Sequence, residues 1–202
     1  MLYALFRIPY SCLVDKANQL AEIAKAIASC EKCRLCEKRL KTVPGDGNPN
    51  AEVLFIGEGP GKSEDLQGKP FVGAAGKFLN VMLESIGLQR EDVFIANVVK
   101  CRPPENRDPQ PDEVEACYPY LAAQLEIIQP KLICTLGRHS MNRFLPGLQI
   151  SKAHGNPLRR KDGRIFLPLY HPAAALYSPS QKEIHLKDFA KIPKILEKIK
   201  GS

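Results

Sequence analysis

Two pairs of cysteines lie far apart in the sequence, and each adjoins a motif rich in polar residues, glycine or proline. Cys30 and Cys33 have the C-x2-C spacing that lets two sulfur atoms reach one metal from a single turn. Cys101 and Cys117 flank a proline-rich segment that begins Cys-Arg-Pro-Pro-Glu-Asn-Arg. Four thiolates drawn from two distant segments predict a metal centre that closes a long loop of the chain.

The residue types alone leave the metal open between zinc and an iron–sulfur cluster, because both accept coordination by thiolates only. Cys36 adds a third cysteine to the first pair, so the spacing does not decide which two of the three are ligands. Cys12 and Cys134 stand apart from the polar motifs, and we expect both to be ordinary buried thiols.

A second set of candidate residues follows short apolar runs that are typical of β-strands. The runs span residues 53–56, 93–96, 132–136 and 165–169. Glu58 follows the first run, Asn97 closes the second, Gly137 follows the third and His171 comes soon after the fourth. Because open α/β sheets bind ligands at the carboxyl ends of their strands, we expect these residues to converge on one crevice.

Segments with apolar residues at helical spacing alternate with these runs. We expect helices over residues 16–29, 75–86, 112–128 and 140–144, and an amphipathic closing helix over 185–200 that Pro193 kinks or interrupts. Alternating strands and helices predict an α/β fold with a central, mostly parallel, four-stranded sheet flanked by helices. The first helix would deliver Cys30 to the metal centre.

A glycine-rich segment follows the first expected strand. Residues 57–63 lack the first glycine of a phosphate-binding P-loop, since Ile56 occupies its position, and Lys62 replaces the third glycine of the dinucleotide-binding pattern. A turn remains whose backbone amides can approach a ligand closely, with Glu58, Glu64 and Asp65 beside it; a plain turn is the alternative.

Other conspicuous residues have an ordinary interpretation and a functional one. Phe71, between glycines in residues 68–73, is either a core residue or a stacking platform for a base. Residues 159–164 form a basic hairpin around an Asp-Gly turn, which is either solvated or a phosphate contact. We expect the remaining histidines to be structural; they are His139, His154 and His185.

Length and composition narrow the class of protein. The chain has 202 residues, 44% hydrophobic, which predicts a single domain over residues 1–202. A net charge of +7 favours a polyanionic partner such as nucleic acid. Seven cysteines without a signal peptide or an apolar span indicate a reducing cytoplasm and no membrane association.

Taken together, the motifs resemble those of the family 4 uracil-DNA glycosylases of bacteria and archaea, which belong to the uracil-glycosylase superfamily. The resemblance runs from about Cys30 to His171 and on through the last helix. It rests on residues 57–65, 68–73, 97–104 and 171–173. It implies a uracil-DNA glycosylase-like fold and a 4Fe-4S cluster whose ligands are Cys30, Cys33, Cys101 and Cys117. Residues 1–29 would be an extension and a helix leading into this cluster, which ties the N-terminal segment to the proline-rich loop. Cys36 falls where family members vary.

The resemblance also implies the reaction, which is hydrolysis of the N-glycosidic bond of a flipped-out uracil during base excision repair. Phe71 would stack on the base, and Asn97 would pair with its O4 and N3–H. Glu64 would fill the space beside C5 and so exclude the methyl group of thymine. Gly57 and Gly59 would bring the backbone against the base on either side of Glu58.

Breaking the bond leaves positive charge on the sugar and negative charge on uracil. The resemblance implies that His171 donates to the uracil anion and that Glu58 orients water or stabilises the cation. In family 1 enzymes an aspartate occupies the position of Gly59, so Glu58 is our inferred substitute for it.

The remaining expectations concern DNA and partners. Arg102 and Arg107 would meet phosphates, and Leu176 would either wedge into the base stack or lie buried in a helix. We expect a monomer that acts on uracil-containing DNA, with a sliding clamp as an open partner. The alternative is an iron–sulfur DNA-binding or redox-sensing member of the same superfamily without turnover. The branch that crosslinks DNA carries an inserted basic loop, which residues 98–104 lack.

Overall fold

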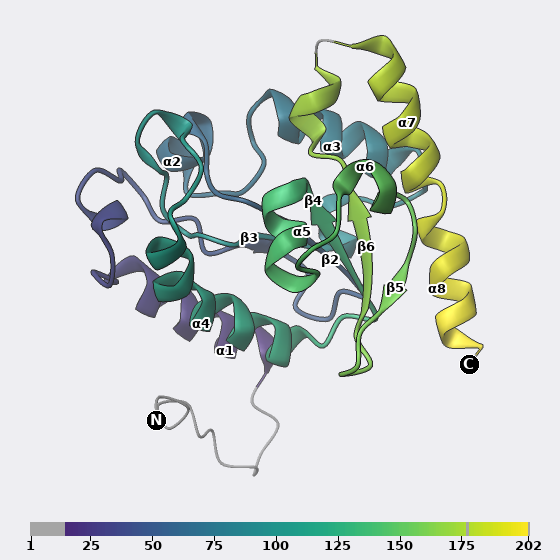
Figure 1. Cartoon of the computed structure of the whole chain (residues 1–202). Helices are drawn as coiled ribbons and strands as arrows, with labels where there is room; N and C mark the ends of the chain where they lie inside the picture. Colours follow the sequence, from purple (N-terminus) through teal and green to yellow (C-terminus); the bar gives the residue numbers. More distant parts are fainter. Residues whose placement is uncertain (1–14, 177, 202) are drawn as a thin grey trace.

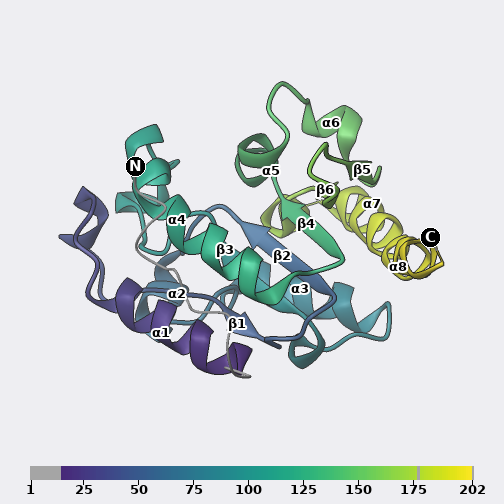
Figure 2. The same cartoon turned by 90° about the horizontal axis from the view of Figure 1, so that it is seen from below.

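A mixed β-sheet lies between two layers of helices (Figures 1 and 2). The computed structural model describes residues 15–176 and 178–201. Within them six strands pair in the order β1-β3-β2-β4-β6-β5. Their bounds are β1 Asp46–Gly47, β2 Val53–Gly57, β3 Phe94–Asn97, β4 Leu132–Leu136, β5 Leu158–Arg159 and β6 Ile165–Leu169.

The prediction of a four-stranded sheet was wrong in the number of strands. The four expected runs form the centre of the sheet, where β3, β2, β4 and β6 pair in parallel. β1 and β5 add one antiparallel strand at each edge. Each edge strand has two residues, which is too short for an alternating apolar pattern to reveal it.

Alternate strand residues face opposite helical layers. Leu54 and Ile56 of β2 belong to the core under α1 (Lys16–Ala28), α4 (Pro111–Ile128) and α5 (Arg138–Phe144). Val53 and Phe55 belong to the core under α3 (Ala74–Glu84), α7 (Pro179–Phe189) and α8 (Ile192–Lys200). The ring of Phe55 stacks on that of Phe189 with centroids 5.6 Å apart. Burying each large apolar side chain stabilises the fold by about 1.5–3 kcal/mol.

The expected helices are present with boundaries shifted by a few residues, except at the C-terminus. There the single expected helix is two helices, α7 and α8, which begin earlier than predicted and break at residues 190–191. Pro193 therefore interrupts the segment as expected, and it lies in the first turn of α8, where its missing N–H leaves no intrahelical hydrogen bond unmade.

Several short elements were not predicted. They are α2 (Lys62–Gln67), α6 (Ile150–Ala153) and the 3-10 turns η1 (Arg34–Cys36), η2 (Arg90–Asp92), η3 (Pro104–Asn106) and η4 (Pro172–Ala175). α2 begins at Lys62, near the end of the glycine-rich segment, so the turn in this segment leads directly into a helix. None of the helices in the described part of the chain is long and apolar enough to cross a membrane.

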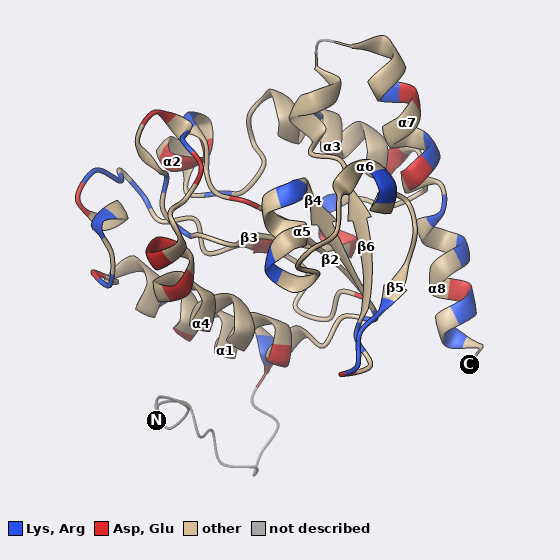
Figure 3. Cartoon of the chain, viewed as in Figure 1, with Lys and Arg blue, Asp and Glu red and all other residues tan. Residues whose placement is uncertain are grey.

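The basic hairpin predicted at residues 159–164 joins β5 to β6. Arg160 donates its backbone N–H to the carbonyl of Arg164 at 2.9 Å, and Gly163 takes a φ of 84° in the turn. Lys and Arg residues lie along this hairpin and along α8 (Figure 3). The hairpin precedes β6 whereas His171 follows it, so the two lie at opposite ends of the strand. This placement favours the solvated interpretation of the hairpin.

The order of the central strands creates a switch point. The chain passes from β2 to β3 on one side and then returns to β4 on the other side of β2. Crevices at the carboxyl ends of strands beside such a reversal are the usual ligand sites of open α/β sheets. Glu58, directly after β2, and Gly137, directly after β4, flank this position.

Candidate functional site

The four strand ends bring the expected polar residues to one edge of the sheet. The carbonyls of Gly57 and Glu58 accept the backbone N–H groups of Val98 and Val99, both at 3.0 Å, which extends the β2–β3 pairing past Asn97. Gly137 donates its N–H to the carbonyl of Leu169 at 2.8 Å, two residues before His171. A Cβ on Gly137 would lie 3.1 Å from the Cβ of His171. The predicted convergence is therefore confirmed.

Asn97 is the most unusual polar residue of this edge. It is 1% exposed, and its Oδ1 has no hydrogen-bond partner within the described part of the chain. A Cβ on Gly57 would come within 2.3 Å of this oxygen and 2.7 Å of the Phe71 ring. A buried acceptor without a partner costs about 1–3 kcal/mol. Only glycine at position 57 lets the backbone lie this close to the Asn97 carboxamide and the Phe71 ring, and the Oδ1 acceptor held there has no donor among the described residues.

Phe71 forms a wall of the same space. It is buried, and its ring centroid lies 5.7 Å from that of His171. Its backbone has a φ of 52°, which is unfavourable for a residue with a side chain. Arg90 holds this conformation by donating to the carbonyls of Pro70 at 2.7 Å and Phe71 at 3.1 Å. Phe71 packs with the core while lining the site, so the two interpretations from the sequence are compatible.

The hydrogen bonds of His171 define its tautomer. Its Nδ1 accepts the backbone N–H of Ala173 at 3.2 Å, so a neutral ring carries its proton on Nε2. Burial lowers the pKa of His171 to about 4, and the neighbouring His185 acts in the same direction. Nε2 of His185 lies 3.2 Å from the His171 carbonyl oxygen. His171 is therefore a neutral hydrogen-bond donor at ordinary pH.

Glu58 has neighbours that the sequence did not indicate. Its carboxylate lies 3.9 Å from Nε2 of His139, which lies 3.1 Å from Oδ2 of Asp108. Burial raises the pKa of Glu58; His139 and Arg138 oppose this rise, whereas Asp108 adds to it. His139, which we expected to be structural, thus lies beside Glu58. Its position two residues after Gly137, in the first turn of α5, was the available signal.

The other two histidines make contacts within the fold, as expected. Nδ1 of His154 lies 2.6 Å from a carboxylate oxygen of Asp188. Nδ1 of His185 lies 2.6 Å from the carbonyl oxygen of Gln181, and the other ring nitrogen contacts the His171 carbonyl.

The acidic residues of the glycine-rich segment hold loops together. The carboxylate of Glu64 accepts the backbone N–H groups of Gly61 at 3.1 Å and of Val72 and Gly73 at 2.9 Å. It thereby joins the start of α2 to the loop that follows Phe71. The buried carboxylate of Asp65 accepts the N–H of Leu40 at 3.0 Å, a role that sequence reasoning missed. Gly59 packs closely against Val99, because a Cβ there would lie 2.8 Å from Cγ2 of that residue.

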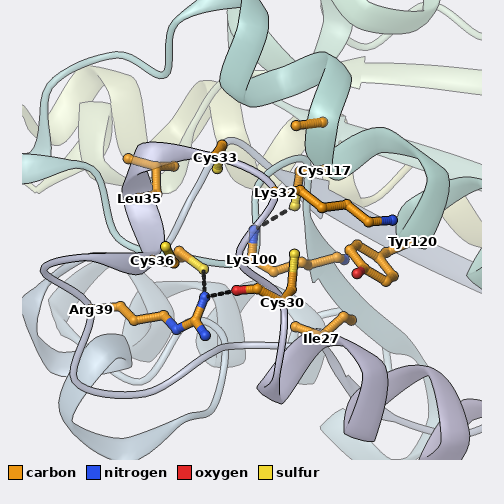
Figure 4. Close-up of a pocket in the computed structure, with 12 residues that line it drawn as sticks. Ile27, Cys30, Lys32, Cys33, Leu35, Cys36, Arg39, Lys100, Cys117 and Tyr120 are labelled. Atoms are coloured by element: carbon orange, nitrogen blue, oxygen red, sulfur yellow. Dashed lines mark hydrogen bonds between the residues drawn. The ribbon is translucent and has the colours of Figure 1, made fainter.

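Five cysteines line one cavity beside α1 and α4 (Figure 4). They are Cys30, Cys33, Cys36, Cys101 and Cys117. The backbone N–H of Lys100 lies 3.2 Å from Sγ of Cys117, and Nη1 of Arg39 lies 3.4 Å from Sγ of Cys101. A set of thiols with N–H donors and a cation directed at the sulfur atoms fits a thiolate-ligated metal centre. The remaining described cysteine, Cys134, is buried in β4, as expected; Cys12 lies outside the described residues.

The residues expected at DNA differ in their surroundings. Both terminal nitrogens of Arg107 donate to the fully buried carboxylate of Glu113, at 2.6 and 2.8 Å, and this pairing lowers the pKa of Glu113. Arg107 is therefore engaged in anchoring its loop to the start of α4. Nε of Arg102 donates to Asn106 at 2.8 Å. Leu176 is half-buried and directly follows η4 as its C-cap, rather than lying inside a helix.

Comparison with known proteins defines the class. Residues 44–200 match the sequence profile of the Uracil DNA glycosylase superfamily. A solution structure of a putative uracil DNA glycosylase from Methanosarcina acetivorans aligns with 76% of this chain and 98% of its own, with a TM-score of 0.50 at 15% identity, which shows a shared fold. The chain belongs to the uracil DNA glycosylase superfamily.

Closer relatives define the branch. The chain is 50% identical to the type-4 uracil-DNA glycosylase of Sulfurisphaera tokodaii over 87% of this chain and 84% of that protein. It is 49% identical to the type-4 enzyme of Archaeoglobus fulgidus over 90% of this chain and 95% of that protein. Within the superfamily the chain therefore belongs to the type-4 uracil-DNA glycosylases, as its motifs indicated.

Proposed function

We propose that this chain flips uracil out of DNA and hydrolyses its N-glycosidic bond, which leaves an abasic site for base excision repair. The observation that carries this proposal is the buried Oδ1 of Asn97 at the end of β3, which has no hydrogen-bond partner among the described residues. An acceptor in this position requires a ligand with a donor, and uracil offers its N3–H. The high identity to type-4 uracil-DNA glycosylases supports the same reaction.

Selection of uracil would follow from the hydrogen-bond pattern of Asn97. Its Oδ1 would accept uracil N3–H while its Nδ2 donates to O4, with the base against the ring of Phe71. Cytosine presents an acceptor at N3 and a donor at N4, so it would leave buried groups unpaired. Glu64, held by the amides of Val72 and Gly73, would limit the space beside C5 and exclude the methyl group of thymine.

Two residues would stabilise the two charges that develop as the bond breaks, the negative charge on uracil and the positive charge on the sugar. Nε2–H of His171 would donate to O2 of the departing uracil anion, since its Nδ1 is occupied by the N–H of Ala173. Glu58 would orient the attacking water or stabilise the positive sugar from the other side of the switch point. Packing of Gly59 against Val99 leaves no room there for an aspartate without movement of the backbone or of Val99.

A pH profile tests the role of His171. Because its pKa is lowered to about 4, the imidazole stays neutral as the pH rises through 6.5, and we expect no loss of single-turnover rate between pH 6 and 8.5. His171→Leu should lower the rate by roughly 100-fold to 1000-fold, and His171→Gln, which keeps an N–H donor, by less. A rate that falls through pH 6.5 would instead identify a charged imidazolium as the acid.

We propose that Cys30, Cys33, Cys101 and Cys117 hold a 4Fe-4S cluster, with Cys36 beside it but not bound. When bound, the cluster would supply a covalent link between the segment after α1 and the loop that precedes α4, because hydrolysis transfers no electrons. Arg39 would offset the negative charge of the thiolates through its contact with Cys101.

We further propose that the protein acts as a monomer in the cytoplasm. Its net charge of +7 and Arg102 would attract the phosphates of uracil-containing DNA, and Leu176 would lie near the vacated base stack. Arg107 would act by fixing the loop rather than by contacting phosphate, because Glu113 occupies its guanidinium group.

The direct test is incubation of the anaerobically purified protein with a duplex containing one uracil, followed by alkali. We expect strand cleavage at uracil and none in matched duplexes with thymine or cytosine. Tight binding of uracil-DNA by iron-loaded protein without cleavage would instead favour the superfamily member without turnover.

A further inference from the structure

The proline-rich loop between Cys101 and Cys117 reaches the edge of the sheet that holds Glu58. Oδ2 of Asp108 in this loop lies 3.1 Å from Nε2 of His139 and 3.3 Å from Nη2 of Arg138. A carboxylate oxygen of Glu58, a carboxylate oxygen of Asp108 and a ring nitrogen of His139 all lie within 4.8 Å of one another. Asp108 is thus brought beside Glu58 from a segment far along the chain.

The loop is braced on both sides of Asp108. The preceding residue, Arg107, forms a bidentate ion pair with the buried carboxylate of Glu113. Gln110 donates its backbone N–H to the same carboxylate at 2.8 Å. A bidentate pair between a guanidinium group and a buried carboxylate is among the strongest hydrogen-bond arrangements in proteins. The backbone around Asp108 is therefore fixed relative to α4, and its carboxylate is directed at the start of α5.

We propose that Asp108 is a positioning residue for Glu58, acting by pairing with His139 and Arg138 and by placing a negative charge beside the Glu58 carboxylate. This inference rests on the proposed role of Glu58 in uracil excision. It gives the loop between the two cysteines a function at the reacting centre.

The charges that face Glu58 come from Asp108, His139 and Arg138. Asp108 opposes ionisation of Glu58, while His139 and Arg138 favour it. With Asp108 present, His139 and Arg138 are paired with it, and Glu58 remains available to water or to the positive sugar. Without it, His139 and Arg138 are free to pair with Glu58, which would lower its pKa and occupy its oxygens.

The prediction concerns Asp108→Asn. We expect the acid limb of the single-turnover pH profile to move to lower pH by roughly 0.5 unit, because the interaction at this distance is weakened by solvent. We expect the plateau rate to fall by roughly threefold to tenfold, because Glu58 becomes engaged by His139. Asp108→Glu should restore most of the wild-type profile.

The matched control is Glu105→Gln, which removes an exposed acid from the same loop. Thermal unfolding and visible absorbance of each variant show that loop and fold are retained. A profile for Asp108→Asn that superimposes on wild type, or an equal shift in Glu105→Gln, would overturn the inference.

Carbon-13 NMR titration of the Glu58 carboxyl, assigned through its loss in Glu58→Gln, measures the same shift without turnover. The NMR shift should appear in Asp108→Asn and be absent in Glu105→Gln. An inactive wild-type protein would therefore contradict the proposed function, while the titration would still decide the effect of Asp108 on Glu58.

Discussion

Replacing Asn97 with alanine is expected to reduce uracil excision by roughly 1000-fold, because the variant loses both hydrogen bonds that read the base. The stability of the fold should stay the same or rise. The Oδ1 atom that is removed has no hydrogen-bond partner within the described residues, so its deletion relieves a buried unsatisfied acceptor and breaks none of their hydrogen bonds.

Single-turnover rates on a single-uracil duplex and urea unfolding of both proteins measure the two effects. Asn50→Ala is the matched control, since Asn50 is exposed and lies before β2, at the other end of the strand from Glu58. Wild-type activity in Asn97→Ala, or a large loss of stability, would show that Asn97 is a structural residue of β3.

Replacing Cys101 with serine is expected to remove most of the bound iron and to lower the free energy of unfolding by on the order of 5 kcal/mol. Cys101 and Cys117 connect the end of the β3 segment to α4, while Cys30 and Cys33 follow α1. Loss of one of four ligands would release the crosslink between these elements. Activity would fall with it, because the loop that carries Asp108 would lose its anchor.

Iron and sulfide content per chain, visible absorbance and urea unfolding check this result. Cys134→Ser is one control, because Cys134 is buried in β4 away from the cavity. Cys36→Ser is the sharper control: it lines the same cavity and should retain iron. Iron loss in Cys36→Ser together with iron retention in Cys33→Ser would show a different ligand set.

The centre of the fold was predictable because its strands are buried on both faces and read as continuous apolar runs. The strand around Phe55 shows this, since every residue of β2 is buried. β1 and β5 have two residues each, and their pairing depends on the tertiary position of Gly47 and of the hairpin. No local pattern encodes the pairing of β1, whereas the Asp-Gly turn of the predicted hairpin was a local signal for the pairing of β5 with β6.

The site was predictable to the extent that residues follow strands. Glu58, Asn97 and His171 are placed by strand ends, which the sequence marks clearly. The sequence did not predict which side chains lie beside Glu58. One of them, Asp108, lies in an irregular loop whose path depends on the ion pair between Arg107 and Glu113. Arg107 was expected at phosphate for the same reason: a charge in a sequence does not reveal its partner.

The measurement that tests the central claim most directly is mass spectrometry of the small molecules released when iron-loaded protein meets a duplex containing one uracil. The account predicts free uracil in amounts equal to the abasic sites formed, and no free thymine or cytosine from matched duplexes. No free base from protein that retains its iron and binds the uracil duplex would contradict it.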